Sequence, residues 1–204
     1  HNSMDRKLLW RHCGKFLRRR SIDNIIQELK ERKERFSFDT LCIWDEVFTY
    51  DEKWLEEFCE IYKREIGVPY WTFIHPYHVT PGCWEVEMGV QTLNQDVKDN
   101  ILHRYEKKED VINAIRLFEG SGVRLVVDVI FGLPQLKDED YIELIDTFNR
   151  YRPTKTQTFW LRYYPETDIV PIAKEQGLLD EQEIQDINDG IPSRAAASGG
   201  SKIN

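Results

Sequence analysis

The sequence predicts an α/β fold, in which helices cover a barrel-like or open sheet of parallel strands. The run from Leu125 to Phe131 is apolar at every position except Asp128, which is typical of a strand covered on both faces. Further β-prone runs alternate with amphipathic helices, and that alternation favours parallel strands joined by right-handed crossovers. Polar residues follow several of these runs, at the strand ends where α/β proteins carry their active surface.

Composition indicates a single soluble domain. The chain has 204 residues, 41% of them hydrophobic, and a net charge of -8, so it can bury one core but not two large ones. The negative charge argues against a nucleic-acid surface, which needs basic residues to neutralise phosphates. The sequence has neither an apolar run of about 20 residues nor the apolar core of a signal peptide, so we expect no membrane partner and a cytoplasmic location.

The chain begins with a basic segment that we treat as a lead-in loop over residues 1–20. Seven Lys and Arg residues stand there against one acid, Asp5. An anionic ligand nearby and a loop that is merely solvated are equally good interpretations of such a run. Ser21 is a favourable N-cap for a helix that continues through Arg35, with its isoleucines on one face.

The next units are a strand, a helix and a second strand. Thr40 to Trp44 predicts a strand that ends at the adjacent acids Asp45 and Glu46. Asp51 then caps a helix from Glu52 to Glu65, because its side chain can accept a hydrogen bond from the first turn. The strand that follows is expected at Tyr70 to Ile74.

The remaining elements continue the alternation. The polar pair Gln91 and Thr92 follows one strand, and Gly132 follows another. Glycine there permits close approach of a ligand to the backbone. In chain order, the expected elements are strand Trp84–Val90, helix Val111–Gly120, strand Leu125–Phe131, helix Asp138–Tyr151, strand Thr156–Tyr164, helix Val170–Gln176 and a C-terminal extension or linker over residues 181–204.

One connection is too short for a usual crossover. Only the residues from His75 to Cys83 separate the strands that end at Ile74 and begin at Trp84, whereas parallel neighbours need about a dozen residues or more. We therefore expect an extended connection without a helix. The missing helix would leave apolar side chains on an outer face partly open to solvent, among them Trp71, Phe73, Trp84 or Val86.

Five segments, taken together, resemble the radical S-adenosylmethionine enzymes. They are R-R-R-S-I-D-N-I-I-Q-E-L, D-E-V-F-T, G-C-W-E-V-E-M-G-V-Q-T, D-V-I-F-G-L-P and W-L-R-Y-Y-P-E-T, in this order, and the resemblance covers Arg18 to Leu179. The resemblance is to the subgroup with an N-terminal cobalamin-binding domain. It implies a partial, TIM-like (β/α)6 barrel, whose strands two to six would lie in residues 21–180, and it implies S-adenosylmethionine and a [4Fe–4S] cluster as cofactors. Whether cobalamin is used stays open.

The resemblance also assigns candidate cofactor-binding residues. Asp45 and Glu46 match the acidic strand end that holds the methionyl amino group, a contact suited to a carboxylate. Gln91 and Thr92 match the strand end that meets the ribose or carboxylate of the same cofactor. The adenine-side wall is matched by Phe131, Gly132, Tyr163 and Tyr164. If Tyr163 and Tyr164 are adjacent on a strand, at most one of them faces the cofactor.

The cluster cysteines of the family are not found here. The family carries three cysteines, separated by three and by two residues, on the loop after the first strand, and this chain has no such spacing. We therefore expect a fragment that lacks the first strand and its cysteine loop. Without those thiolates the chain alone should be inactive. It carries neither catalytic nor metal-binding candidates of its own.

Three hypotheses for function follow. The first is the core of a radical enzyme that, when complete, makes a 5′-deoxyadenosyl radical for a methyl transfer or a rearrangement of a small-molecule substrate. It would receive electrons from a reductase or a flavodoxin-like donor. The second is an ordinary α/β-barrel enzyme that uses Asp45, Glu46 and Asp128 as acid and base, although Asp128 suits a hydrogen-bonded structural carboxylate better. The third is a non-catalytic binding module.

Overall fold

The computed structural model describes residues 19–45, 48, 51–74 and 83–191. Its centre is a five-stranded sheet in which the strand order is the chain order, β1-β2-β3-β4-β5. All four neighbouring pairs are parallel, which confirms the predicted α/β fold. The strands are β1 Leu41–Ile43, β2 Tyr70–Ile74, β3 Glu85–Gln91, β4 Arg124–Phe131 and β5 Lys155–Trp160.

The helices begin where the sequence provides caps. The Ser21 hydroxyl accepts a hydrogen bond from the Asn24 N–H, and the Asp51 carboxylate accepts one from the Trp54 N–H, so both predicted N-caps are confirmed. The described helices are α2 Ile22–Arg35, α3 Glu52–Glu65, α4 Gln95–Val97, the π-helix η1 Lys98–Leu102, α5 Lys108–Phe118, α6 Asp138–Tyr151, α7 Ile169–Glu175 and α8 Glu181–Asn188.

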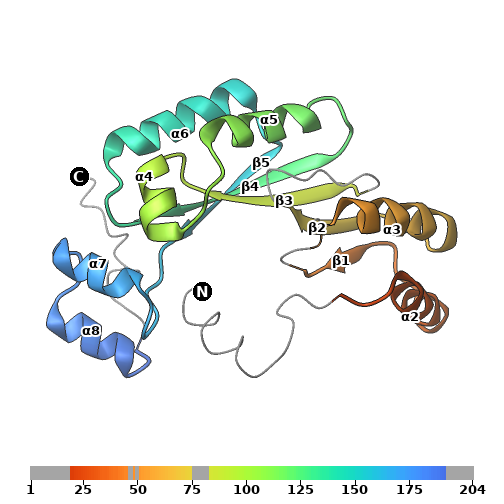
Figure 1. Cartoon of the computed structure of the whole chain (residues 1–204), viewed down its shortest axis with the longest axis horizontal. Coiled ribbons are helices and arrows are strands. Elements are labelled where there is room, and N and C mark those ends of the chain that lie inside the picture. Colours follow the sequence, from red (N-terminus) through yellow and green to blue (C-terminus); the bar gives the residue numbers. More distant parts are fainter. Residues whose placement is uncertain (1–18, 46–47, 49–50, 75–82, 192–204) are drawn as a thin grey trace.

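Helices α2, α3, α5 and α6 lie along the outer side of the curved sheet (Figure 1). Burial alternates along β2, where Tyr70, Thr72 and Ile74 are buried and the residues between them are half-buried. The ring of Tyr70 packs edge-on against Tyr62 of α3, with centroids 5.2 Å apart. The outer face of β2 is therefore covered by α3, the helix that precedes this strand in the chain.

This packing corrects the expected outer patch. Val86 is fully buried in the main core, because its side chain points to the outer face that the helices cover. Trp71 and Phe73 lie on the opposite, inner face, in register with Glu85 and Glu87. The parallel pairing of β2 and β3 agrees with the prediction, but residues 75–82 of the connection lie outside the described residues.

Several element boundaries differ from the prediction. Strand β5 ends at Trp160 rather than Tyr164, and α5 begins at Lys108 rather than Val111. The sequence analysis missed α4 and η1, which follow β3, because a single helical turn and a π-turn have no clear hydrophobic period. It also missed α8, which lies within the segment treated as an extension or linker.

A second, smaller hydrophobic cluster holds the C-terminal helices together. It is built from Tyr163, Ala173, Leu179 and Ile187, which are all buried. The Asp180 carboxylate caps α8 by accepting a hydrogen bond from the Glu183 N–H at 2.7 Å. Helices α7 and α8 lie beyond the ends of the strands rather than along the sheet (Figure 1).

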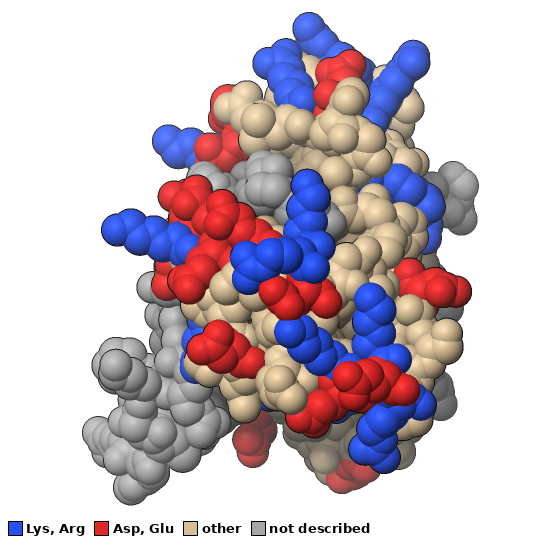
Figure 2. Space-filling model, turned by 90° about the vertical axis from the view of Figure 1, so that its right-hand side faces the viewer, with Lys and Arg blue, Asp and Glu red and all other residues tan. Residues whose placement is uncertain are grey.

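Charges of both signs cover the outer surface. Figure 2 shows Lys and Arg side chains interleaved with Asp and Glu over one face of the molecule. Some of them form ion pairs, such as Lys30 with Glu65 at 2.7 Å. No helix in the described ranges combines the length and apolar character needed to cross a membrane.

Candidate functional site at the carboxyl ends of the strands

The carboxyl ends of the parallel strands meet at one edge of the sheet, which faces α4 and α7 (Figure 1). Asp45 lies two residues beyond the end of β1, Gln91 is the last residue of β3, and Gly132 follows the last residue of β4. We call this edge, with Asp45, Gln91, Thr92, Phe131 and Gly132, the carboxyl rim. Glu46 lies outside the described residues.

Gln91 has an unusual backbone conformation at the rim. Its φ is 66°, in the left-handed region that a non-glycine residue rarely adopts. The register of β3 against β4 shifts between Gly89 and Gln91, so the strand bulges there and turns the Gln91 side chain. The side-chain Oε1 is buried and has no hydrogen-bond partner within the described part of the chain. Such an atom indicates a place where a ligand donor would be stabilising.

Arg104 brings a cation to the same place. Its Nη2 donates to the Gly89 carbonyl at 2.6 Å, and its Nε donates to Glu106 Oε1 at 2.8 Å. A Cβ built on Gly89 would come within 2.7 Å of Gln91 Nε2 and 3.4 Å of Arg104 Nη1. Glycine at position 89 therefore lets an amide and a guanidinium lie together over the inner face of the sheet. The sequence analysis missed Arg104 because it lies after η1, far from any strand end.

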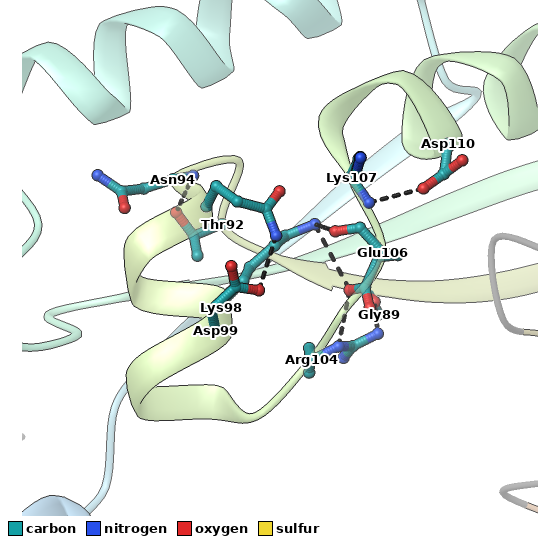
Figure 3. Close-up of polar contacts among 10 residues, drawn as sticks. Gly89, Thr92, Asn94, Lys98, Asp99, Arg104, Glu106, Lys107 and Asp110 are labelled. Carbon is teal, nitrogen blue, oxygen red and sulfur yellow. Dashed lines mark hydrogen bonds and ion pairs between the residues drawn. The ribbon is translucent and has the colours of Figure 1, made fainter.

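A buried ion network holds Arg104 in place, and Figure 3 shows Arg104, Glu106 and Lys98 converging beside η1. Lys98 and Glu106 are 0% and 1% exposed. Lys98 Nζ donates to the Glu106 carbonyl at 3.3 Å and lies 3.5 Å from Glu106 Oε1. Burial lowers the pKa of Lys98, and the charge of Glu106 opposes that effect. The network fixes the loop that leads from η1 back to the rim.

Thr92 and Asn94 are used to build the turn after β3. The Thr92 hydroxyl accepts a hydrogen bond from the Asn94 N–H at 3.1 Å, and the side chain is 2% exposed. The Asn94 side chain caps α4 by accepting from the Val97 N–H, and it donates to Asp140 on α6. Thr92 thus stabilises the turn that connects the rim to α4.

Phe131 and Gly132 form the rim at β4. Phe131 stacks on Tyr141, with centroids 5.0 Å apart, and it contacts Trp160 at 5.6 Å. The Gly132 N–H donates to the Tyr141 hydroxyl at 3.1 Å. The φ of Gly132 is 80°, a conformation in which any side chain would be strained. The result is an aromatic wall beside a turn at Gly132 that carries no side chain.

The two tyrosines after β5 have different environments. Tyr163 is buried in the second cluster with Ala173 and Leu179, and burial raises its pKa to about 12. Tyr164 is 59% exposed, and its carbonyl accepts a hydrogen bond from Thr167 Oγ1. The expected strand included both tyrosines, but in the structure they follow its end. Their directions are therefore set by the loop after β5 and not by the pleat of the strand.

A carboxyl pair lies on the inner face below the rim. Asp128 is in register with Gly89. Glu87 precedes Gly89 by two residues, so its side chain lies on the same face of the sheet. The pKa of Glu87 is raised to about 7, first by burial and then by its hydrogen bond to Asp128. Gln157 Nε2 donates to Asp128 Oδ1 at 3.2 Å, as the structural interpretation of Asp128 predicted. The sequence shows the alternation of Glu85 and Glu87 but not the strand register, so it could not reveal the pair.

No metal-binding group is formed by the residues that the structure describes. Within the described ranges, no three His, Cys, Asp or Glu side chains lie close enough together to hold an ion. Cys42 is exposed, Cys59 is half-buried and Cys83 is buried, and none of the three is in a disulfide. These residues do not fit an iron–sulfur cluster, which needs grouped thiolates.

Comparison with known proteins gives matches in structure but not in sequence. No family model and no curated protein matches the chain. The radical S-adenosylmethionine methyltransferase TsrM from Kitasatospora setae, solved with cobalamin and a [4Fe-4S] cluster, has a TM-score of 0.65 and 19% identity over 77% of this chain and 34% of its own. HemN from Escherichia coli, a coproporphyrinogen III oxidase described as a radical SAM enzyme, has a TM-score of 0.60 and 17% identity over 83% and 43%.

These similarities establish the architecture. The archaeal Elp3 of Methanocaldococcus infernus also matches, with a TM-score of 0.52 and 18% identity over 76% of this chain and 44% of that one. The chain has the fold of the partial, TIM-like barrel in radical SAM enzymes, and it spans about a third of the length of TsrM. At such low identity the match defines the fold and leaves the function to the site.

Proposed function

We propose that this chain is part of the catalytic barrel of a radical SAM enzyme and that its carboxyl rim binds S-adenosylmethionine. The observation that carries the proposal is the arrangement of Gln91 and Arg104 over Gly89. A guanidinium and an amide donor lie there beside an unpaired, buried carbonyl oxygen. This combination suits a molecule with both a carboxylate, which would accept from Arg104, and a hydroxyl group, which would donate to Gln91 Oε1, as the carboxylate and the ribose of S-adenosylmethionine would.

The other rim residues suit the remaining parts of the same molecule. Asp45 places a carboxylate at the end of β1, where it would hold the methionyl ammonium group, with Glu46 following it in the chain. Phe131 offers an aromatic wall and Gly132 a position without a side chain, which suit a flat base. Tyr164 is the exposed member of the tyrosine pair, and it would close the site from the β5 side.

S-adenosylmethionine, when reduced by a [4Fe–4S] cluster, would supply methionine and a 5′-deoxyadenosyl radical that takes a hydrogen atom from an unactivated C–H bond. The residues described here would bind and orient the cofactor. The described cysteines do not form a cluster site, so the thiolates would come from elsewhere in the complete enzyme. Cobalamin-dependent methyl transfer to a small molecule is the specific reaction that we propose, with a reductase or flavodoxin-like protein as electron donor.

The decisive experiment adds the upstream part of the reading frame to the chain. We expect that the longer protein gains a [4Fe–4S] absorbance on anaerobic reconstitution and cleaves S-adenosylmethionine to 5′-deoxyadenosine, whereas residues 1–204 alone do neither. If the complete gene encodes no three-cysteine loop, the radical mechanism is wrong.

A variant tests the rim separately from the cluster. In the longer protein, Arg104→Gln should raise the KM for S-adenosylmethionine at least tenfold and leave the cluster spectrum unchanged, because it removes one charge-assisted hydrogen bond worth about 1.5–3 kcal/mol. Lys107→Gln, an exposed neutralisation on the same loop, is the matched control and should leave the KM as it is. Equal effects of the two variants would contradict the assignment.

A further inference from the structure

The inner face of the sheet carries a cavity that extends from Trp44, next to Asp45 of the carboxyl rim, toward the amino ends of the strands. It has a volume of about 440 Å³ and is lined by Trp44, Trp71, Glu85, Glu87, Lys155 and Gln157, among others. Lys155 is the first residue of β5, and Glu85 is the first residue of β3, so the cavity reaches toward the amino ends of the strands. Its size lies within the range of small-molecule sites.

One side of this inner cavity is aromatic and open to solvent. Trp44 packs edge-on against Trp71 and Phe73, with centroids 5.2 and 5.4 Å away. This geometry leaves the residue 77% exposed. A tryptophan held by two aromatic neighbours yet open to solvent presents a rigid apolar surface, and such surfaces mark places where a ligand binds.

The other side of the cavity is lined by the carboxyl groups of Glu85 and Glu87 and the ammonium group of Lys155. Glu87 hydrogen-bonds to Asp128, which accepts from Gln157. The two basic side chains nearby are already engaged: Lys155 Nζ donates to Gln157 Oε1 at 3.1 Å, and Arg124 Nε lies 3.5 Å from Glu85 Oε2. Among the charged residues that line the cavity, two carboxyl groups face one ammonium group, so the lining favours a cation over an anion once Glu87 is ionised.

We propose that the inner cavity binds a small ligand that has a flat apolar body and a protonated nitrogen. The apolar body lies against Trp44 and Trp71, and the nitrogen lies beside the Glu87 carboxyl group once that group has lost its proton. Cations bind favourably over indole faces and beside carboxylates. This site needs neither the rim nor the proposed radical chemistry, so the two proposals can fail independently.

Proton release is the signature of this binding mode. The groups that face Glu87 are Asp128, Glu85 and Lys155, and with them Glu87 keeps its proton until about pH 7. A ligand cation that replaces that proton binds better once the proton has left. We expect the affinity for a cation to rise about tenfold between pH 6 and pH 8, as the ionised fraction of a group with this pKa does.

The experiment compares three probes that share one aromatic body. Phenethylammonium, 2-phenylethanol and 3-phenylpropionate are titrated into the 204-residue chain by calorimetry at pH 6 and pH 8. We expect phenethylammonium to bind at least tenfold more tightly than the other two at pH 8, and to release protons into the buffer at pH 6, where Glu87 is still protonated. Equal binding of the three probes, or preference for 3-phenylpropionate, would overturn the proposal.

Variants locate the binding. Glu87→Gln should remove both the preference for the cation and its pH dependence, while Glu119→Gln, an exposed neutralisation at the end of α5, should change neither. Trp44→Ser should weaken the binding of phenethylammonium and of 2-phenylethanol by similar factors, because it removes the apolar contact that both probes make. Thermal melts of each variant show that it is folded. If Glu87→Gln folds and still prefers the cation, the carboxyl pair is not the site.

Discussion

At the scale of single residues, Glu87 has a carboxyl group that remains protonated when an ordinary glutamate is ionised. Its folded-state pKa of about 7 lies above the reference value of 4.5, so the folded chain binds a proton that the unfolded chain releases between these values. The stability that this group contributes is therefore fully present below pH 4.5 and lost as the pH rises through 7.

The variant Glu87→Gln should show this effect as a change in pH dependence. Its amide donates to Asp128 at every pH, so the variant should match the natural chain at pH 4.5 and exceed it at pH 8 by about 1 kcal/mol, after allowance for solvent screening. Urea unfolding at the two pH values measures the difference. An identical pH dependence in the two proteins would mean that Glu87 titrates normally.

Lys98 and Glu106 provide a second test at the residue scale. Glu106→Gln leaves the fully buried Lys98 without its carboxylate, and we expect a loss of about 3 kcal/mol or more in the free energy of unfolding. Adding Lys98→Met to this variant should restore part of the loss, because the unpaired charge is gone. Denaturant titration of both single variants and the double variant gives the coupling. Strictly additive effects would contradict a direct interaction.

At the scale of elements, the N-cap of α3 can be tested with a matched pair of variants. Asp51→Ala removes the acceptor for the Trp54 N–H and should cost about 1 kcal/mol. Asp51→Asn keeps an acceptor, although it loses the contact with Arg19 at 3.5 Å, and this exposed ion pair should matter little. An equal loss for Asn and Ala, measured by thermal unfolding, would show that the ion pair, which both variants remove, is the stronger interaction.

Elements with strong local signals were predictable from the sequence. Ser21 and Asp51 are followed by apolar residues at helical spacing, and the range of α3 agrees with the prediction. The run of β4 was apolar enough to identify it as an interior strand. These features depend on neighbours in the chain, so the sequence contains the information directly.

Features that depend on pairing between strands were not predictable. The register that brings Asp128 beside Gly89 and the bulge that turns Gln91 are set by contacts between segments far apart in the chain. Arg104 reaches the rim only because η1 and the loop after it fold back over β3. Tyr163 could not be assigned to the second cluster without α8, whose partners come from α7. Candidate rim residues could thus be named, but their partners could not.

At the scale of the whole molecule, the net charge of -8 keeps exposed aromatic side chains of neighbouring molecules apart. The sequence pI is about 5.2, and near that pH the repulsion vanishes while Trp44 and Tyr164 remain 77% and 59% exposed. We expect association, measured by light scattering, to be strongest near pH 5 and weak at pH 8. Trp44→Ser should reduce it at pH 5, and an unchanged signal would show that Trp44 takes no part in the contact.

The sheet has the same order in space as in the chain, from β1 to β5. Each strand therefore pairs with the one synthesised just before it, and no strand has to wait for a distant segment to emerge from the ribosome. Sequential neighbours also shorten the loops that must close before a contact forms, which lowers the entropic barrier to folding. The described sheet can consequently assemble vectorially, one β–α unit after another, during translation.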